Sequence, residues 1–351
     1  MKQSHQFFLD YYHSKYCQHN KSDDKLLFSR HLITDHLDHI FDNIIKPTFP
    51  TQSQQLQKKK NFKIVKQYND EPIQLKEEWK EMNHGFNTID IIEWIIETCN
   101  TNQLESILSK LIPPVLRILD DYSIENKNRA VILVHNMISK LDSDVIIKFG
   151  LENVFIDALF YCLKYLSDDR DLPLLQSTYS CLIDLVAKTK PAGSKERCML
   201  FDKMMTDGII LGLTYAGHKS SFLKVFLQTI DKLIPELGAL TIQYLKVIIF
   251  AIDNGLQLLN IEINHLSLTL LEHTIQKAWP RIPFHGPTIL KGLVTAWLNN
   301  CDKPDIESQE LCNHIKTVYQ SLYYLCHEKI EPDIQALLNY NHSLSLLLNN
   351  K

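Results

Sequence analysis

Apolar side chains recur every three or four residues along almost the whole chain, and strict alternation of apolar and polar residues is nearly absent. This spacing places apolar side chains on one face of an α-helix, whereas a half-buried strand needs a period of two. Ile89, Ile92 and Ile96, for example, share one face of a helix. Asn87 or Thr88 could cap that helix. The pattern therefore predicts an all-α protein.

The same spacing predicts a series of further helices. Ser123 can cap a helix that runs to about Lys140, and Gly150 can end the short helix that follows it. Beyond this point, helices are expected over residues 151–166, 171–188, 194–216, 220–234, 236–258, 262–279, 285–300, 304–329 and 332–348. Since most connections are only a few residues long, neighbouring helices should be antiparallel.

Helix pairs recur at intervals of about 40 residues, which is the period of HEAT and armadillo repeats. No such pair can bury its own apolar face, so each must stack on the next pair along the chain. We therefore predict an α-solenoid of HEAT/armadillo-like antiparallel helix pairs.

One predicted pair, Ile112–Ile138, carries the internal pattern of such repeats. Pro113 should bend its first helix, Asp120 and Asp121 lie in the turn, and Arg129 follows on the second helix. In repeats of this kind, the turn aspartate and the helix arginine can bind each other or the backbone of a neighbouring repeat. These four residues are therefore the predicted structural HEAT turn.

Three segments are expected along the chain. Residues 1–46 predict an N-terminal helical unit with helices over Gln3–Cys17 and Asp23–Lys46, tethered to or folded back on the main array. Residues 47–72 begin PTFPTQSQQLQKKK and predict a polar linker or loop. Residues 73–351 predict the HEAT-like α-solenoid.

Composition narrows the functional classes. The chain has 351 residues, 45% of them hydrophobic, and a net charge of −4, so it can bury a large core but lacks the general basic character expected of a nucleic-acid-binding protein. It has only 10 glycines and no GxSxG, GxxxxGK[ST], GxGxxG or HExxH motif. A non-enzymatic protein without a cofactor is the interpretation that these features favour.

The termini and cysteines indicate an intracellular protein. Met1–Asp10 lacks the apolar region of a signal peptide, and the longest strongly apolar run, Val247–Ile252, is far shorter than the ~18 residues that span a bilayer. The 8 cysteines are scattered without a CxxC pair, as expected for buried thiols in a reducing compartment.

Lys58-Lys59-Lys60 is either a solvated loop or a weak nuclear-import or anion-binding signal.

Two groups of residues could suggest a metal site. The run from His31 to His39 is rich in histidine and aspartate, but a polar helix face of this kind is more often solvated than metal-bound. Cys312 and Cys326 would lie ~21 Å apart on one helix, too far to share an ion. We therefore predict no metal site.

The candidate partner-binding residues lie in the C-terminal third. Trp279 stands at a helix end in the segment AWPRIP, with Arg281 two residues later, and tryptophan and arginine are common hot-spot residues in protein interfaces. The alternative is a buried tryptophan beside a structural proline. Trp297 is a further candidate aromatic anchor.

At the C-terminus, the segment YNHSLSLLLNNK either packs inward or presents an apolar edge to another subunit through Leu344, Leu347 and Leu348.

An ordered set of segments resembles the Tel-two-interacting protein two family, the smallest subunit of the TTT (Triple T) complex. The resemblance covers about residues 77–300 and is centred on Ile112–Val186. It is carried by Glu78-Trp79-Lys80, LIPPVLRILDD at Leu111–Asp121, FGLENVFIDALFYCL at Phe149–Leu163, LPLLQSTYSCLIDLV at Leu172–Val186, LGALTIQYLKVII at Leu237–Ile249 and HTIQKAWPRIP at His273–Pro283. The family's long acidic insertion has no counterpart here.

The resemblance implies a HEAT-repeat scaffold without enzymatic activity. Such a scaffold would bind Tel-two-interacting protein one directly and Tel-two through the complex. With the ninety-kilodalton heat-shock chaperone and the RuvB-like machinery, the complex would support the biogenesis of phosphatidylinositol-kinase-related protein kinases, which act in DNA-damage signalling and telomere maintenance. The expected partners include no nucleic acid and no membrane, and the expected location is the cytoplasm, with the nucleus as a second location.

Two alternatives remain open on the sequence alone. One is a different HEAT or armadillo adaptor, such as a transport receptor or a phosphatase scaffold. The other is an enzyme with an unrecognised helical fold, which would need a deep polar pocket lined by groups with shifted pKa values.

Overall fold

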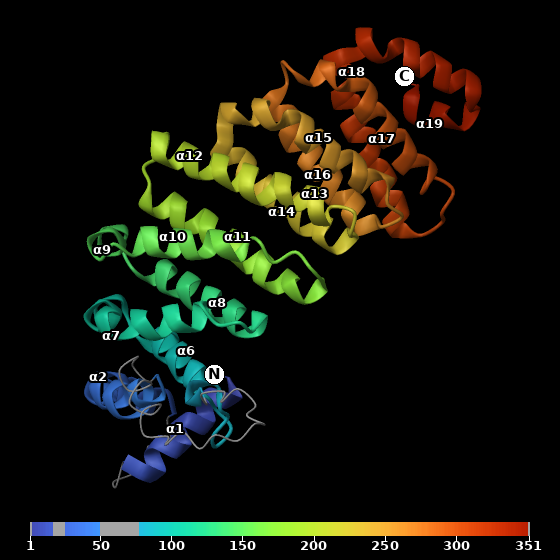
Figure 1. The fold of residues 1–351 in the computed structure, drawn as a ribbon. Coiled ribbons are helices and arrows are strands. Elements are labelled where there is room, and N and C mark those ends of the chain that lie inside the picture. The colour runs from blue at the N-terminus through green and yellow to red at the C-terminus, as the bar shows by residue number, and fades with distance from the viewer. Residues whose placement is uncertain (1, 17–24, 50–76, 350–351) are drawn as a thin grey trace, which may run out of the picture. The chain divides into compact units, whose positions relative to one another are not determined.

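The computed structural model describes residues 2–16, 25–49 and 77–349, in which helices make up all the regular structure apart from one isolated bridge between Asn83 and Phe86 (Figure 1). The prediction of an all-α protein is confirmed for this part of the chain. The structure divides into two compact units, Met1–Leu151 and Glu152–Lys351, called unit 1 and unit 2 below.

Unit 1 contains two groups of helices separated by the segment around residues 50–76. Its elements are α1 (Gln3–Tyr16), α2 (Lys25–Asp35), α3 (Leu37–Ile40), the π-helix η1 (Phe41–Ile45), α4 (Lys46–Thr48), the 3-10 turn η2 (Glu78–Lys80), α6 (Thr88–Thr98), α7 (Thr101–Leu119), α8 (Ile124–Lys140) and α9 (Ser143–Lys148).

The N-terminal helices pack directly on α6. The ring centroids of Phe8 and Trp94 lie 5.2 Å apart, and the indole N–H of Trp94 donates a hydrogen bond of 2.8 Å to the hydroxyl of Ser29. Phe8 and Trp94 are both buried. The N-terminal helices are therefore folded back on the first helices that the sequence assigned to the solenoid.

The two compact units of the structure have a boundary different from the segment boundaries that the sequence predicts. Unit 1 joins the predicted 1–46 unit to the beginning of the predicted 73–351 array, and the boundary between the units lies at Leu151. Of the predicted linker 47–72, only residues 47–49 lie in the described part, and Pro47 and Thr48 belong to α4.

Helix α6 has well-defined ends. At its start, the side chain of Asn87 accepts a hydrogen bond from the backbone N–H of Asp90 while the Asp90 carboxylate accepts one from the N–H of Asn87, a capping box. The cap predicted at Asn87 is thus confirmed. At the other end, the ammonium of Lys140 donates to the carbonyls of Ile96, Glu97 and Cys99 at 2.7, 2.6 and 3.0 Å.

Unit 2 consists of helices joined mostly by short turns. Its elements are α10 (Leu151–Cys162), η3 (Asp169–Asp171), α11 (Leu172–Thr189), α12 (Lys195–Lys203), the π-helix η4 (Met204–Ile210), α13 (Leu211–Ala216), α14 (Ser220–Leu237), η5 (Gly238–Leu240), α15 (Thr241–Gln257), α16 (Ile261–Ala278), η6 (Ile282–Phe284), α17 (Gly286–Leu298), α18 (Ile306–Tyr340), η7 (His342–Leu344) and α19 (Ser345–Leu348). The helix predicted over 194–216 is the continuous run α12–η4–α13.

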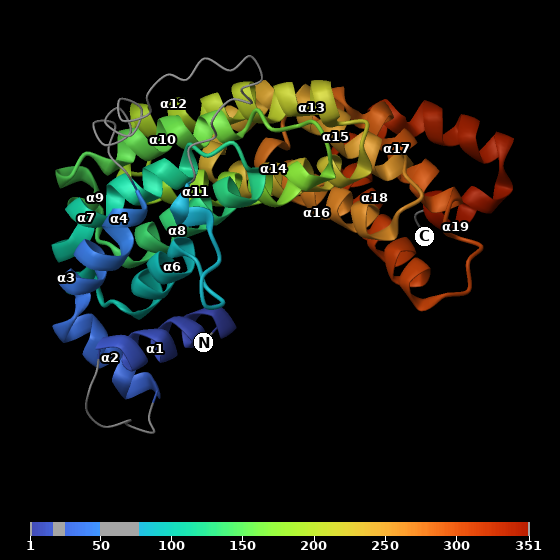
Figure 2. The ribbon, with the colours of Figure 1, turned by 60° about the horizontal axis from the view of Figure 1, so that its bottom comes forward.

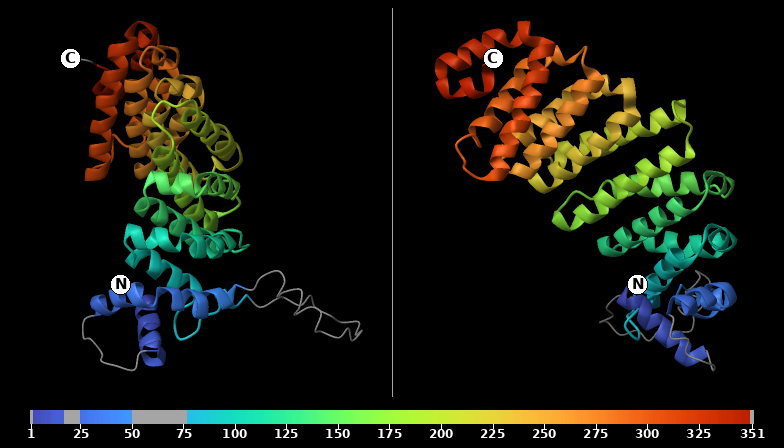
Figure 3. Two further views of the ribbon diagram at one scale, coloured as in Figure 1. Left: turned by 90° about the vertical axis from the view of Figure 1, so that its left-hand side faces the viewer. Right: turned by 180° about the vertical axis from the view of Figure 1, so that it is seen from behind.

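The helices α14 to α18 stack in a regular order. Each of these helices contacts at least one of its neighbours in sequence. In addition, α16 contacts both α14 and α18, and α15 contacts α17 (Figures 2 and 3). Alternate helices thus form two layers whose apolar faces meet. The core of this part of unit 2 lies between the layers.

The stretch Ser220–Gln257 is long and apolar enough to cross a membrane by length and composition. Gly238, with a φ of +51°, interrupts it, and the helices on either side, α14 and α15, pack against each other and against α16. Many of its apolar side chains, among them Leu233 and Ile248, are therefore buried against other helices of unit 2, although Phe250 and Ile242 are exposed.

The C-terminal helix differs from the prediction in one respect. Two helices were expected, 304–329 and 332–348, separated just before Pro332. Instead α18 runs through Pro332 and is kinked at Cys326, whose φ and ψ are −143° and 24°. The thiol of Cys326 donates to the carbonyl of Leu322 at 3.0 Å and so bridges the kink.

Candidate partner-binding surface

The segment after α16 turns sharply and exposes several large side chains. Helix α16 ends at Ala278, and the backbone N–H of Arg281 returns to the Ala278 carbonyl at 2.9 Å. Pro280 cannot donate a backbone hydrogen bond, which favours the end of a helix. Ala278 and Ile282 are buried, and Ile282 belongs to η6, which contacts α18. The turn is thereby fixed at both ends while the residues between them face solvent.

Trp279 lines a shallow hollow between α16 and α18. It is 59% exposed, and Tyr324 on α18 is 85% exposed. The hollow has a volume of about 480 Å³ and is lined by Ile275, Gln276, Trp279, Gln320, Ser321, Tyr324 and Leu325. Two aromatic side chains from different helices thus flank one solvent-facing depression.

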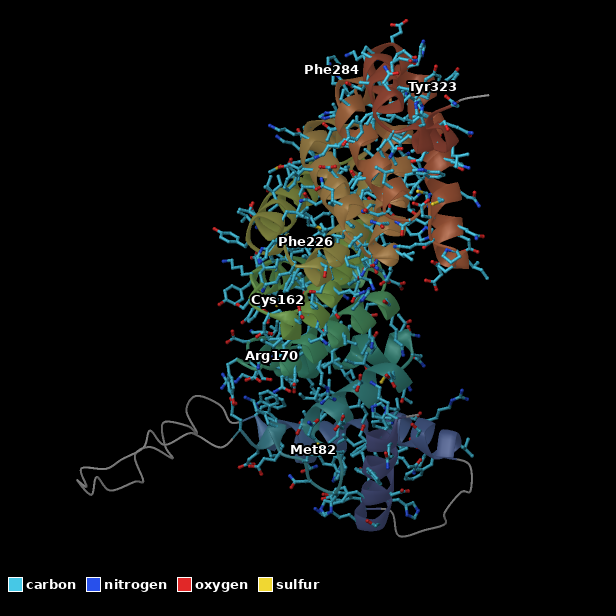
Figure 4. The ribbon with its side chains drawn as sticks, turned by 90° about the vertical axis from the view of Figure 1, so that its right-hand side faces the viewer. Met82, Cys162, Arg170, Phe226, Phe284 and Tyr323 are labelled. Atoms are coloured by element: carbon cyan, nitrogen blue, oxygen red, sulfur yellow. The ribbon has the colours of Figure 1, made fainter. Side chains whose placement is uncertain are left out.

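Two cations lie next to an exposed phenylalanine in the turn that follows Trp279. Phe284 is 66% exposed (Figure 4). The guanidinium carbon of Arg281 lies 5.8 Å from its ring centroid and the ammonium nitrogen of Lys329 lies 4.0 Å from it, within the range of cation–π attraction. We call the surface formed by Trp279, Arg281, Phe284, Tyr324 and Lys329 the aromatic edge.

The structure corrects the other candidate partner residues. Trp297 is 4% exposed and lies under the ammonium of Lys316, 5.2 Å from the ring centroid. Leu344, Leu347 and Leu348 are 1%, 4% and 3% exposed because η7 and α19 pack against α18. These four side chains belong to the core, so of the two C-terminal alternatives the inward-packed one is observed.

The predicted turn residues of the first repeat also differ in their contacts. Pro113 lies inside α7 without ending it, and Asp120 caps that helix at its C-terminus. The buried Asp121 accepts hydrogen bonds from Lys80 at 2.5 Å and Asn126 at 2.7 Å, and Arg129 donates to Asp90 at 2.8 Å. Asp121 and Arg129 therefore do not bind each other: each binds other side chains, and Asp121 also accepts a hydrogen bond from the backbone of Tyr122.

Burial and hydrogen bonding act in opposite directions on Asp121. Burial alone would raise the pKa of its carboxyl group, but the hydrogen bonds from Lys80 and Asn126 and the charge of Lys80 lower the pKa on balance. The carboxylate form is therefore favoured, and it links η2, the end of α7 and the start of α8.

Burial suppresses the reactivity of two cysteine thiols. The described cysteines are all free thiols. Burial raises the pKa of Cys99 to about 12 and that of Cys326 to about 11, so both are protonated at neutral pH.

One histidine pair approaches the geometry of a ligand set. The Nδ1 atoms of His265 and His314 lie 3.3 Å apart, and His314 Nε2 lies 3.3 Å from a carboxylate oxygen of Glu272. Burial, and then the neighbouring His314, lowers the pKa of His265. Within residues 2–16, 25–49 and 77–349, no three histidine, cysteine or carboxylate side chains converge as metal ligands would.

Sequence reasoning missed three members of the aromatic edge. Phe284 stands three residues after Arg281 in the same loop, and its place among prolines could have marked it as solvent-facing. Tyr324 and Lys329 belong to a helix some forty residues further on, and only the packing of α18 on α16 and η6 brings them here.

Comparison with known proteins places the chain among related sequences. The model of the Tti2 family matches residues 13–260. The chain is 27% identical over 239 residues to TELO2-interacting protein 2 of Mus musculus and 26% identical over 229 residues to that of Rattus norvegicus. It is 24% identical over 235 residues to the protein of that name from Homo sapiens.

These matches cover only part of each protein. The alignments include 62% of this chain and 43% of each rodent protein, and 64% and 44% for the human one. The chain thus spans less than half the length of the curated relatives it matches. Since the family match ends at residue 260, the aromatic edge lies beyond it and its assignment rests on the structure.

Proposed function

Because the chain belongs to the Tti2 family, we propose that it is a non-enzymatic scaffold subunit of the TTT co-chaperone complex. In this role it supports the folding, stability and assembly of phosphatidylinositol-kinase-related protein kinases together with the ninety-kilodalton heat-shock chaperone. The observation that carries the proposal is the family match over residues 13–260. The name of each of the three relatives, TELO2-interacting protein 2, describes an interaction with TELO2.

The arrangement of helices supports a binding function. The two layers formed by α14, α16 and α18 and by α15 and α17 are the packing expected of HEAT-like pairs, so the proposal includes a HEAT-like α-solenoid. Stacked pairs present long, rigid surfaces to other proteins without any need for a catalytic site.

Within the complex, Tel-two-interacting protein one is the proposed direct partner, and Tel-two is reached through it. The kinases and the chaperone machinery are proposed as indirect partners. The aromatic edge is the proposed contact surface, since buried tryptophan, tyrosine and arginine side chains contribute most of the binding energy in many interfaces. The proposed location is the cytoplasm, with a nuclear pool.

Co-expression of this chain with Tel-two-interacting protein one from the same host, followed by size-exclusion chromatography, tests the proposal. We expect co-elution at a defined stoichiometry. Separate elution of two folded proteins would contradict it. A matched pair of variants, Trp279→Ala on the aromatic edge and Leu259→Ala at an exposed site between α15 and α16, then tests the surface: the first should weaken co-elution and the second should not.

A further inference from the structure

We infer that the aromatic edge recognises an acidic segment of a partner protein, one that carries apolar side chains between its carboxylates. This inference rests on the proposed scaffold function and specifies the chemistry of what that surface binds. It follows from the exposure, the charges and the fixed geometry of the residues between α16 and α18.

The apolar part of the edge is large and already in place. Trp279, Phe284 and Tyr324 are 59%, 66% and 85% exposed. The backbone that carries the first two is held by the buried Ile282 and by hydrogen bonds from the N–H of Arg281 to Ala278 and from that of Phe284 to Arg281, at 2.9 and 3.1 Å. A partner that covers these rings gains apolar burial without first ordering the turn.

The charged part of the edge lacks carboxylate partners. Among the residues that the structure describes, no aspartate or glutamate forms an ion pair with Arg281 or Lys329, which instead lie over the Phe284 ring. Elsewhere in unit 2, comparable cations are neutralised within the chain, as Lys190 is by Glu152 at 3.1 Å. A carboxylate arriving beside Phe284 would therefore meet two cations whose attraction is not already used.

The hollow beside Trp279 fits the same kind of partner. Its polar lining is neutral, with Gln276, Gln320 and Ser321, and no carboxylate is among the residues that line it. Lys277 adds a further exposed cation in the last turn of α16. Glu328 and Asp333 are exposed carboxylates on the same helix as Lys329, and neither forms an ion pair with it.

A nucleic acid is also acidic, but this surface fits it less well. Affinity for nucleic acid comes mainly from many phosphate contacts, and proteins that bind nucleic acid therefore carry a patch or stripe of basic residues. The edge offers two cations, Arg281 and Lys329, in a chain with a net charge of −4. The apolar rings and few cations suit a protein segment in which carboxylates alternate with apolar anchors.

Trp279 provides a direct readout of the edge in the full chain. The other three tryptophans, Trp79, Trp94 and Trp297, are 2%, 1% and 4% exposed, so collisional quenchers should act mainly on Trp279. With Arg281, Lys277 and Lys329 nearby, iodide should quench its fluorescence more strongly than caesium does. The double variant Arg281→Glu/Lys329→Glu should reverse that order.

Binding is measured with two fluorescently labelled peptides of about 15 residues. Both carry leucine and phenylalanine at the same positions, with helical spacing. The remaining positions are glutamate in the acidic peptide and lysine in the basic one. We expect fluorescence anisotropy to show binding of the acidic peptide alone, weakened by salt, and the bound peptide to protect Trp279 from iodide. The double variant should bind about tenfold more weakly. Lys246→Glu, at an exposed site on α15, is the matched control and should bind as the unaltered chain does.

Several results would overturn the inference. The two peptides could bind equally or both fail to bind, an oligothymidylate of similar length could bind more tightly than the acidic peptide, or light scattering could show that the edge joins two copies of this chain and that Trp279→Ala makes it monomeric. The proposed function is judged separately. Co-elution with Tel-two-interacting protein one that Arg281→Glu/Lys329→Glu leaves unchanged would retain the function and reject the inference.

Discussion

Trp279 and Trp297 are separated by only one turn and one helix but have opposite surroundings. Trp279 is 59% exposed at the end of α16, whereas Trp297 is 4% exposed within α17. The sequence places Trp279 at a helix end before Pro280, but it makes both tryptophans candidates for partner binding. Which of the two faces solvent depends on whether another helix covers it.

This contrast gives a prediction at the residue scale. Trp297→Ala should lower the free energy of unfolding by about 3–5 kcal/mol because it leaves a cavity in the core. Trp279→Ala should change that free energy by less than about 1 kcal/mol because its side chain is mostly solvated. Urea denaturation followed by circular dichroism measures both. Equal losses of unfolding free energy in the two variants would show that Trp279 is a core residue and not part of the binding surface.

Glu93 on α6 lies in a buried cluster of charges in unit 1. Burial acts to raise the pKa of its carboxyl group, but His5 and Lys2 as hydrogen-bond partners and the charges of Lys2 and Arg129 lower the pKa to about 2. The imidazole Nε2 of His5 lies 3.7 Å from one of its oxygens, and Arg129 lies 3.6 Å away. The cluster joins α1, α6 and α8.

The lowered pKa predicts a pH dependence with a definite sign. A carboxyl whose pKa falls from 4.5 to about 2 on folding stabilises the folded state above the unfolded pKa and loses that contribution as pH falls from about 4.5 to 2. The loss should amount to about 2–3 kcal/mol. Glu93→Gln should remove most of this pH dependence, whereas Glu125→Gln, at an exposed site on α8, should keep it. Urea unfolding at a series of pH values tests this, and an unchanged slope in Glu93→Gln would contradict it.

At the scale of elements, two lysines of α8 bind the carbonyl ends of the helices before it. Besides Lys140 at the end of α6, the buried Lys127 donates to the Leu119 carbonyl at 2.8 Å at the end of α7. The last carbonyls of a helix lack intrahelical partners and carry partial negative charge, so an ammonium group from a neighbouring helix satisfies them. In this way α8 fixes the ends of both preceding helices.

Replacing Lys140 tests this role. Lys140→Met keeps the length of the side chain but leaves the carbonyls of Ile96, Glu97 and Cys99 without their ammonium donor, which should cost about 1–3 kcal/mol. Lys148→Met is the control, because the Lys148 side chain is 72% exposed and lies 3.8 Å from Glu105. Its effect should stay within about 0.5 kcal/mol. Thermal melts of both variants test this. Equal melting midpoints for the two variants would show that water satisfies the α6 carbonyls as well as the Lys140 ammonium group does.

At the scale of the whole molecule, the C-terminal segment completes unit 2. Besides the burial of Leu344, Leu347 and Leu348, the hydroxyl of Tyr319 donates to the Leu348 carbonyl at 3.2 Å. Leu346, between them, is 71% exposed. The segment covers the apolar face of α18.

Deleting Tyr340–Lys351 should therefore destabilise unit 2 rather than remove only a binding edge. We expect a loss on the order of 5 kcal/mol, since three buried leucines are lost from the core. Leu346→Ala should change the stability by less than about 0.5 kcal/mol. If the deleted chain kept its melting midpoint and lost only partner binding, the packing described here would be wrong.

Much of the fold could be predicted because helix formation is largely local. The ranges expected for 220–234, 262–279 and 285–300 match α14, α16 and α17 closely, since apolar periodicity and capping residues act within a few turns. The kink in α18 at Cys326 was missed because the sequence marks only Pro332. The sequence leaves the fold-back of the N-terminal helices as one of two alternatives, because nothing within residues 1–46 indicates which surface Phe8 contacts.

The sequence by itself determined the all-α class, most helix ends, the cap at Asn87 and the choice of Trp279 and Arg281 as candidates. Each depends on residue types a few positions apart. Only the tertiary structure decided that Trp297 and the C-terminal leucines are buried and that Lys140 binds the carbonyls at the end of α6. It also decided that Tyr324 lies beside Trp279 and Lys329 beside Phe284. The physical reason is that burial and charge pairing depend on which helices pack together, and helical periodicity shows that a face is apolar without showing what covers it.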